Sequence, residues 1–277
     1  MTAPGEGATG TVLDEIVAAR RRSVQRARRA VSLPRIRARA QSAPPAGDFG
    51  AALSAPGMSI ITEMKRSSAS AGSLAPGLDP AEMAAAFVDG GAAAISVLTE
   101  PDYFSGSLAD LQAAKRVAAP RGVPVMQKDF IVSEYQVYEA AVHGADAVLL
   151  IVAILEPGLY ADLLGLARRL GLGTLVEVFT ARELDAALIE DPPVIGINNR
   201  NLRTLQTDLT TFEKLAPLVP GDKLLVAESG MANADDVRRM ERAGARAVLV
   251  GESLMRAGRV RDSVRALTGS TTRGADT

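Results

Sequence analysis

From residue 58 onward, hydrophobic residues gather in eight short runs, separated by longer stretches that mix alanine, leucine and charged residues. Continuous apolar runs of this kind are typical of strands that are covered on both faces. We therefore predict eight strands, at residues 58–63, 93–98, 123–128, 145–151, 173–178, 194–198, 223–228 and 245–250.

The stretches between these runs have helical periodicity. We predict helices near residues 79–89, 107–118, 133–143, 157–170, 181–190, 208–218 and 232–243, and a last one over 252–267. Repeated strand–helix units form parallel sheets with right-handed crossovers. Eight units in about 220 residues favour a single (β/α)8 TIM barrel, whose usual size is about 250 residues. An open, doubly wound sheet is the alternative, but its first strand normally leads into a G-x-G-x-x-G loop, and EMKRSSASAG does not match that pattern.

An extra N-terminal helix is predicted before the barrel. Its apolar stripe consists of Leu13, Ile16, Val17, Val24, Ala27 and Val31. Asp14 and Glu15 lie in the first turn, where they complement the helix dipole. Pro34 and the segment QSAPPAGD then predict a break before the first strand. We expect an N-terminal extension over residues 1–50 packed on the barrel, the barrel over 51–267, and a flexible tail over 268–277.

Nine arginines lie between Arg20 and Arg39. Nucleic-acid binding or a transit peptide would each explain such a basic stretch. We favour the simpler interpretation, an amphipathic helix whose apolar side packs on the domain. We therefore expect no nucleic-acid partner.

Composition narrows the classes of site. The 277-residue chain is 47% hydrophobic with a formal net charge of -1, which gives no global attraction to nucleic acid or anionic membranes. It has no cysteine and only one histidine, His143, so a thiolate or histidine-rich metal centre is excluded. No apolar run approaches the roughly 20 residues that span a bilayer, and MTAPGEGATG lacks the order of a secretory signal. We expect a soluble, cytoplasmic protein without a membrane partner.

Ionisable and amide side chains stand at the ends of the apolar strands, where barrels of this type have their active sites. The residues are Glu63, Lys65, Lys128, Glu177, Asn198, Arg200, Glu228 and Ser229. Each alone could cap a helix or pair with a surface charge. Together they would be costly in a barrel mouth unless they paired or served a ligand. Such a group can also supply the acid and base of proton-transfer chemistry, so we predict a catalytic site.

Glycines after the last two strands predict a site for an anion. Ser229-Gly230 and Gly251-Glu252-Ser253 each precede a helix N-terminus, where backbone N–H groups favour negative charge. Phosphate sites in these barrels commonly use the same two loops. The glycines could instead simply permit tight turns. Ser68 and Ser70, in the Ser/Ala/Gly-rich first loop, could add donors, and we expect this loop to close over substrate.

Other polar and aromatic residues have ordinary explanations. We expect His143 to cap or pack a helix, Asp129 to pair or orient a loop, and Asp146 and Glu100 to satisfy backbone groups. Phe104 and Phe130 could line an aromatic-substrate pocket, although apolar packing explains them equally well.

Seven segments, in order, resemble the indole-3-glycerol-phosphate synthase family. They are ITEMKRSSASAG, ISVLTEPDYFSGSL, QKDFIVSEYQ, LVEV, IGINNRNL, VAESG and LVGESLM. The resemblance runs from about residue 11 to 267 and includes the extra N-terminal helix. Short pieces such as AESG recur in other phosphate-binding barrels, whereas the combination of EMK, KDF and INNRNL is specific.

The resemblance implies a reaction of tryptophan biosynthesis. The substrate, 1-(2-carboxyphenylamino)-1-deoxyribulose 5-phosphate, closes its indole ring and loses carbon dioxide and water, without a metal or organic cofactor. The family's pattern implies that Lys128 is the general acid, that Lys65 holds the carboxylate, and that Glu177 is the base. Glu63 would position Lys128.

The resemblance assigns the remaining residues to binding. Asn198, Arg200, Glu228, Ser229 and Phe130 would contact substrate. Ser68, Gly230, Gly251, Glu252 and Ser253 would surround the phosphate.

Two features depart from that expectation. The family usually reads Ser-Pro-Ser in the first loop, whereas this chain has Ser68-Ala69-Ser70, so we expect weaker substrate binding or altered loop kinetics with retained chemistry. Glu252 adds a repulsive charge beside the phosphate unless its side chain points outward. A catalytically weak or silent paralogue, acting in a specialised indole pathway or as a binding partner, is therefore an alternative. Phosphoribosylanthranilate isomerase is a second alternative, but that family uses a cysteine base and this chain has no cysteine.

Overall fold

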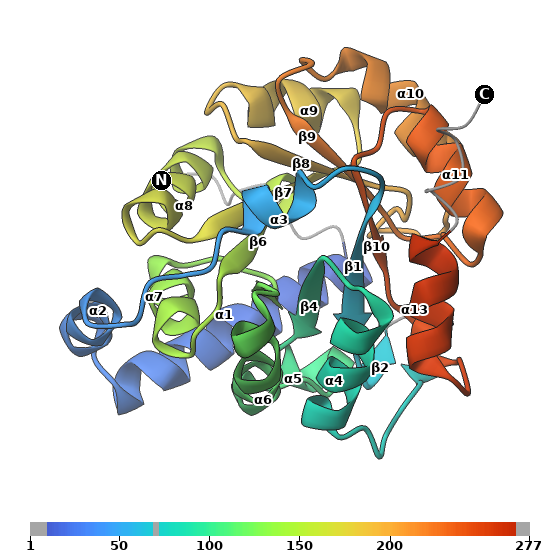
Figure 1. Ribbon diagram of the computed structural model, residues 1–277. Helices are drawn as coiled ribbons and strands as arrows, with labels where there is room; N and C mark the ends of the chain where they lie inside the picture. The colour runs from blue at the N-terminus through green and yellow to red at the C-terminus, as the bar shows by residue number, and fades with distance from the viewer. Residues whose placement is uncertain (1–9, 69–71, 270–277) are drawn as a thin grey trace.

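Eight parallel strands close into a barrel in the computed structural model, which describes residues 10–68 and 72–269 (Figure 1). The strands are β1 (Ser59–Met64), β4 (Ala94–Leu98), β5 (Val125–Lys128), β6 (Ala147–Ile151), β7 (Gly173–Val178), β8 (Val194–Asn198), β9 (Leu224–Glu228) and β10 (Ala247–Val250). β1 pairs with both β4 and β10, which closes the ring. The predicted barrel is confirmed, and the predicted strand limits differ from the observed ones by at most two residues.

Helices cover the outside of the ring. They are α4 (Pro80–Gly90), α6 (Leu108–Ala118), α7 (Glu134–Val142), α8 (Pro157–Arg169), α9 (Ala181–Leu188), α10 (Thr210–Leu215), α11 (Ala234–Arg242) and α13 (Val260–Thr268). Short elements are α5 (Pro101–Phe104), α12 (Glu252–Met255), and the 3-10 turns η1 (Ala119–Arg121), η2 (Val152–Ile154) and η3 (Ala216–Leu218). Side-chain caps start several helices, because the oxygens of Asp79, Ser107 and Ser133 accept from backbone N–H groups of the first turn.

Three helices precede the barrel, where the sequence predicted one. They are α1 (Val12–Ala30), α2 (Leu33–Gln41) and α3 (Phe49–Leu53). The chain leaves helical structure at residues 31–32, directly before Pro34, and again over residues 42–48. Between these two breaks lies α2, which the sequence did not predict. Pro34 lies in its first turn, where the missing N–H removes no helical hydrogen bond. A capping box between Thr11 and Asp14 starts α1.

The N-terminal helices cover both ends of the barrel. Phe49 and Leu53 of α3 join the apolar cluster inside the ring, and Phe49 lies against Gly173 at the start of β7. α3 therefore closes the N-terminal ends of the strands. α1 runs behind the strands in Figure 1, and its residues Leu13 and Ile16 line the cavity at the opposite, C-terminal ends.

Two loops differ from the prediction. The last helix is divided into α12 and α13, and Gly258 lies in the interruption, consistent with the low helix propensity of glycine. In the first loop, β2 (Ser67–Ser68) pairs with β3 (Gly72–Ser73) as a short antiparallel ribbon. Ala69 and Ser70 lie outside the described residues, as do most of the predicted tail and the first nine residues. The division into extension, barrel and tail remains a prediction.

Candidate active site

Four charged side chains from separate strands meet above the apolar interior of the barrel. Glu63 and Glu177 are the penultimate residues of β1 and β7, and Lys128 and Glu228 end β5 and β9. The ammonium nitrogen Nζ of Lys128 lies 3.0 Å from Oε2 of Glu228, 3.4 Å from Oε2 of Glu63 and 3.9 Å from Oε2 of Glu177. Lys128 is therefore surrounded by three carboxylates that come from three different strands.

A second lysine joins this cluster from the turn after β1. Nζ of Lys65 lies 2.6 Å from Oε1 of Glu63, so Glu63 contacts both lysines. Burial alone would raise the pKa of the Glu63 carboxyl, but Lys65 and Lys128 lower that pKa to about 2. Burial lowers the pKa of Lys128, but its carboxylate neighbours, Glu228 first, outweigh this and raise the pKa well above its ordinary value. Lys128 therefore stays protonated, as a proton donor must be.

Glu177 has the opposite environment. Burial and the nearby charge of Glu228 raise the pKa of Glu177 to about 8, although Lys128 and a hydrogen bond from Asn198 act against this shift. Nδ2 of Asn198 donates that bond to Oε1 of Glu177 at 3.0 Å. A carboxyl with a raised pKa can exchange a proton near neutral pH, which suits a general base. The site thus places a lysine that is protonated at rest beside a carboxyl that titrates near neutral pH.

Two glycines make room for the carboxylates. A Cβ at Gly251 would meet the Glu63 side chain, 2.5 Å from Oε1 and 2.9 Å from Cβ, and a Cβ at Gly196 would overlap Glu228. Glycine inside a strand often marks such a close approach. From the sequence, Gly251 was expected to bind phosphate and Gly196 had no predicted role, although a glycine within the apolar run VIGIN was the available signal.

The cavity above the cluster has one apolar wall and one polar wall. The apolar wall includes Phe104, Phe130, Leu98, Ile151 and, from α1, Leu13 and Ile16. The rings of Phe104 and Phe130 lie 6.0 Å apart. The polar wall carries Lys65, Asn198, Arg200 and Ser229 together with the charged cluster. This lining suits a ligand that carries both a flat ring and polar groups.

A second cavity continues from the first over the ends of β9 and β10. It is lined by Gly230, Gly251 and Ser253, and shares Lys65 and Arg200 with the first cavity. Ser229 and Gly230 both have left-handed backbone angles, with φ of 64° and 90°. A left-handed serine is uncommon, and such residues concentrate at functional sites. The combination of cations, hydroxyls and turn amides suits a phosphate.

Arg200 and Glu252, which both line this second cavity, form an ion pair, with Nη2 of Arg200 3.5 Å from Oε2 of Glu252. Glu252 also pairs with Arg256 at 3.3 Å. The carboxylate of Glu252 therefore forms ion pairs with two arginines. Arg256 was not identified from the sequence, because an arginine after a four-residue helix has no pattern that separates it from surface charge.

Except for Glu228, which is fully buried, the predicted site residues line the two neighbouring cavities, and one of them lies in a different cavity from the one expected. Ser68 is buried and lines the first cavity, whereas it is not among the residues that line the second. Four residues that were predicted to have structural roles also have them. The carboxylate of Glu100 accepts three N–H groups of α5, Asp146 accepts from the backbone of Gly47 and Val125, and His143 is the C-cap of α7. Asp129 pairs with Arg20 instead of pointing at the cluster.

Within residues 10–68 and 72–269, no group of three or more His, Asp or Glu side chains is arranged to hold a metal ion. In the same part of the chain, no helix has the length and apolar character needed to cross a membrane.

Comparison with known proteins agrees with this geometry. The family profile described as "Indole-3-glycerol phosphate synthase" matches residues 13–267. An indole-3-glycerol phosphate synthase from Rhodococcus jostii (strain RHA1) is 47% identical over 254 residues, which cover 92% of this chain and 93% of the relative. The chain belongs to the indole-3-glycerol phosphate synthase family.

Other members of the indole-3-glycerol phosphate synthase family are similar to the same extent. The protein of that name from Mycolicibacterium smegmatis (strain ATCC 700084 / mc(2)155) is 47% identical over 256 residues, with 92% and 93% of the two chains covered. Among solved structures, 3-hexulose-6-phosphate synthase from Salmonella typhimurium matches with a TM-score of 0.61 at 11% identity, covering 77% of this chain and 98% of that one. Thiamine phosphate pyrophosphorylase from Pyrococcus furiosus matches with a TM-score of 0.60 at 16% identity, covering 77% and 95%. These two structural similarities show a shared fold and nothing more.

Proposed function

We propose that this chain closes the indole ring of 1-(2-carboxyphenylamino)-1-deoxyribulose 5-phosphate, with Lys128 as general acid and Glu177 as general base. The observation that carries the proposal is the 3.9 Å separation of Lys128 Nζ and Glu177 Oε2, between an apolar wall and a cationic cavity. An acid and a base this close can act on neighbouring atoms of one substrate.

The first step forms a carbon–carbon bond. The ring carbon that bears the carboxylate attacks the ribulose carbonyl carbon, and Lys128 protonates the carbonyl oxygen as its negative charge develops. The carboxylate then leaves as carbon dioxide, and its bonding electrons return to the ring. Lys65, beside Glu63, is placed to hold the carboxylate before this loss, and Phe130 and Phe104 to hold the ring.

The second step removes water. The former carbonyl oxygen, now a hydroxyl, leaves with a proton from Lys128, while Glu177 takes the carbon-bound proton whose loss makes the five-membered ring aromatic. Asn198 orients Glu177, and Glu228 holds Lys128 from the other side at 3.0 Å. Lys128 regains a proton from solvent between the two steps and again after the second. Glu177 releases the proton that it gained to solvent before the next turnover.

The phosphate supplies binding energy away from the reacting atoms. We assign it to the second cavity, with the backbone of Gly230 and Gly251 and the hydroxyl of Ser253 as donors and Arg200 as cation. The substrate is thus a small phosphosugar–anthranilate compound. A role in amino-acid biosynthesis supports a cytoplasmic location.

Indole fluorescence tests the function directly. We expect purified protein, mixed with the carboxyphenylamino substrate and no added metal, to form the fluorescent product, and Lys128→Ala to abolish turnover while still binding substrate. Tight binding without turnover in the unsubstituted protein would instead support a silent paralogue.

A further inference from the structure

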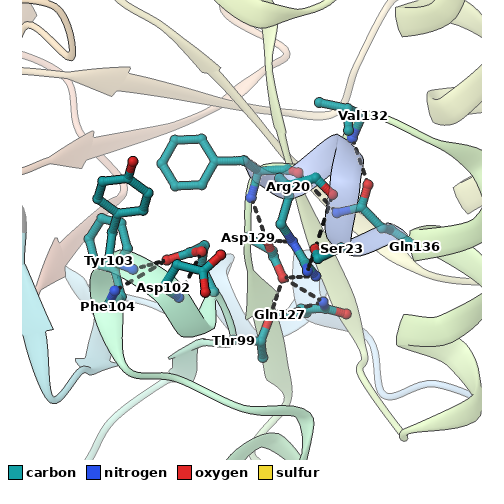
Figure 2. Close-up of polar contacts among 12 residues, drawn as sticks. Arg20, Ser23, Thr99, Asp102, Tyr103, Phe104, Gln127, Asp129, Val132 and Gln136 are labelled. Atoms are coloured by element: carbon teal, nitrogen blue, oxygen red, sulfur yellow. Dashed lines mark hydrogen bonds and ion pairs between the residues drawn. The ribbon is translucent and has the colours of Figure 1, made fainter. Parts of the chain in front are cut away.

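A buried ion pair joins the N-terminal helix to the strand that carries Lys128. Nε of Arg20, on α1, lies 2.6 Å from Oδ1 of Asp129, and its Nη2 lies 2.7 Å from Oδ2 (Figure 2). Arg20 is 7% exposed and Asp129 1% exposed. Two parallel bonds of this kind fix the relative orientation of the two groups, as a single ammonium contact would not.

The carboxylate of Asp129 is part of a wider hydrogen-bond network at the same end of the barrel. The hydroxyl of Thr99, which follows β4, donates to Oδ2 at 2.6 Å. The side-chain amide of Gln127 donates to that hydroxyl at 3.0 Å. Asp129 therefore ties together α1, the end of β4 and the end of β5.

The same carboxylate holds the residues on either side of it. Lys128 precedes Asp129 directly, and the backbone N–H of Phe130 donates to Oδ1 of Asp129 at 2.8 Å. The carbonyl of Phe130 accepts from Nε2 of Gln136 at 2.9 Å, so both polar groups of this residue's backbone are bonded. Figure 2 shows Asp129 with Arg20, Thr99 and Gln127 around its carboxylate.

We propose that Arg20 is a positioning residue, which acts through Asp129 to hold Lys128 and Phe130 in their working places. Neither Arg20 nor Asp129 belongs to the cluster of Glu63, Glu177 and Glu228 around Lys128. Loss of the guanidinium leaves the Asp129 carboxylate buried with a neutral hydroxyl and amides as donors, and the turn that carries Lys128 shifts to satisfy it. A displacement of about 1 Å at a reacting group can cost about 100-fold in rate.

The inference rests on the proposed roles of Lys128 and Phe130, and one set of variants separates the two claims. In Arg20→Met the apolar stem is kept and the guanidinium is lost. Arg20→Lys keeps a cation, and Arg26→Met is the matched control, because Arg26 is an exposed arginine of the same helix. The fraction of folded protein is measured by circular dichroism, and turnover is expressed per folded molecule.

We expect Arg20→Met to lower kcat about tenfold or more, with KM changed less than about threefold. Arg20→Lys should recover only part of that loss, because a single ammonium contact does not fix the orientation of Asp129. Arg26→Met should match the unsubstituted protein. The double variant Arg20→Met/Asp129→Asn should be no slower than the slower single variant, because the two residues act as one unit.

A kcat of Arg20→Met within about twofold of the parent value, per folded molecule, would overturn the proposal and leave the pair with a purely structural role. If Arg20→Met does not fold, Thr99→Val removes another donor to Asp129 without burying an unpaired charge, and the same criterion applies to it. An inactive unsubstituted protein would contradict the proposed function instead, so the two failures are distinguishable.

Discussion

Asn198 donates a hydrogen bond to Glu177 across neighbouring strands, with Nδ2 of the amide 3.0 Å from Oε1 of the carboxylate. The other end of the amide is also used, since Oδ1 of Asn198 accepts from the backbone N–H of Arg200 at 2.9 Å. The bond favours the ionised form of Glu177 against burial and the charge of Glu228. Asn198 therefore contributes to both the orientation and the proton affinity of the proposed base.

Asn198→Ala should make that base harder to ionise. Removing the hydrogen bond raises the pKa of Glu177 further, so the acidic limb of the kcat/KM profile should move to higher pH by about half a unit or more. Activity at neutral pH should fall by about tenfold or more. A pH profile measured from pH 5 to 10 checks this, and an unshifted limb would argue against Glu177 as the titrating base.

Glu228→Gln should move the same limb in the opposite direction. The charge of Glu228 raises the pKa of Glu177, so the neutral amide should shift the limb to lower pH by about one unit. The maximal rate should fall as well, because Glu228 also holds Lys128 at 3.0 Å. The test is therefore the pH at which the acidic limb of the kcat/KM profile lies, and not the maximal value of kcat/KM. A shift to higher pH would contradict the assigned coupling.

Glu177→Gln should stabilise the fold while abolishing turnover. The pKa of Glu177 is about 8 in the folded protein and lies near 4.3 in an unfolded chain, so ionisation costs folding free energy progressively as pH rises between these values. The amide cannot ionise and should therefore raise Tm by about 2–5 °C at pH 8, and by less at pH 5.

Thermal unfolding of both proteins at the two pH values measures this effect. Glu156→Gln, at an exposed position, is the control and should leave Tm nearly unchanged at both values. A Tm for Glu177→Gln that falls at pH 8 would mean that the carboxylate is stabilised in place by its neighbours.

Gly251→Ala should displace Glu63. The added Cβ would lie 2.5 Å from Oε1 and 2.9 Å from Cβ of Glu63, so either the strand end or the carboxylate must move. We expect a loss of about 1–3 kcal/mol in the free energy of unfolding and a fall of about tenfold or more in kcat/KM. Gly221→Ala is the control, because a Cβ there meets no atom within 4 Å. Equal losses of stability and kcat/KM in the two variants would show that the contact with Glu63 is not the cause.

Ala69→Pro should lower KM with kcat retained. Proline restricts the unbound loop and reduces the entropy lost when substrate orders it, which we expect to lower KM by about two- to fivefold. The prediction rests on the sequence alone, since Ala69 lies outside the described residues. Steady-state kinetics test it, and an unchanged KM would count against a role for this position in binding.

The barrel and its charged mouth were predictable because each depends on local patterns. Apolar runs identify buried strands, and a parallel barrel brings every strand end to one rim, so Glu63, Lys128 and Glu228 had to approach one another once the fold was known. Distances and proton affinities were not predictable, because they depend on side-chain geometry across strands.

The role of α1 could not be read from the sequence for a different reason. A helical stripe indicates that one face is buried but does not say what that face covers. Arg20 stands in a run of nine arginines and differs from its neighbours only in burial, which the sequence does not record. Leu13 and Ile16 were correctly expected to pack on the domain, but their place in the wall of the cavity follows only from the way α1 crosses the barrel.

Asp146 attaches the N-terminal segment to the barrel at the N-terminal ends of the strands. Its carboxylate, at the start of β6, accepts the backbone N–H of Gly47 at 2.5 Å and binds Nζ of Lys115. Arg20 is bonded to Asp129 at the opposite, C-terminal ends of the strands. The segment from Arg20 to Gly47 is therefore attached at both ends of the barrel. Detaching this segment breaks the buried ion pair of Arg20 with Asp129 at one end and the hydrogen bond of Gly47 to Asp146 at the other. The ordering of the N-terminal segment is therefore coupled to the rim that carries Lys128.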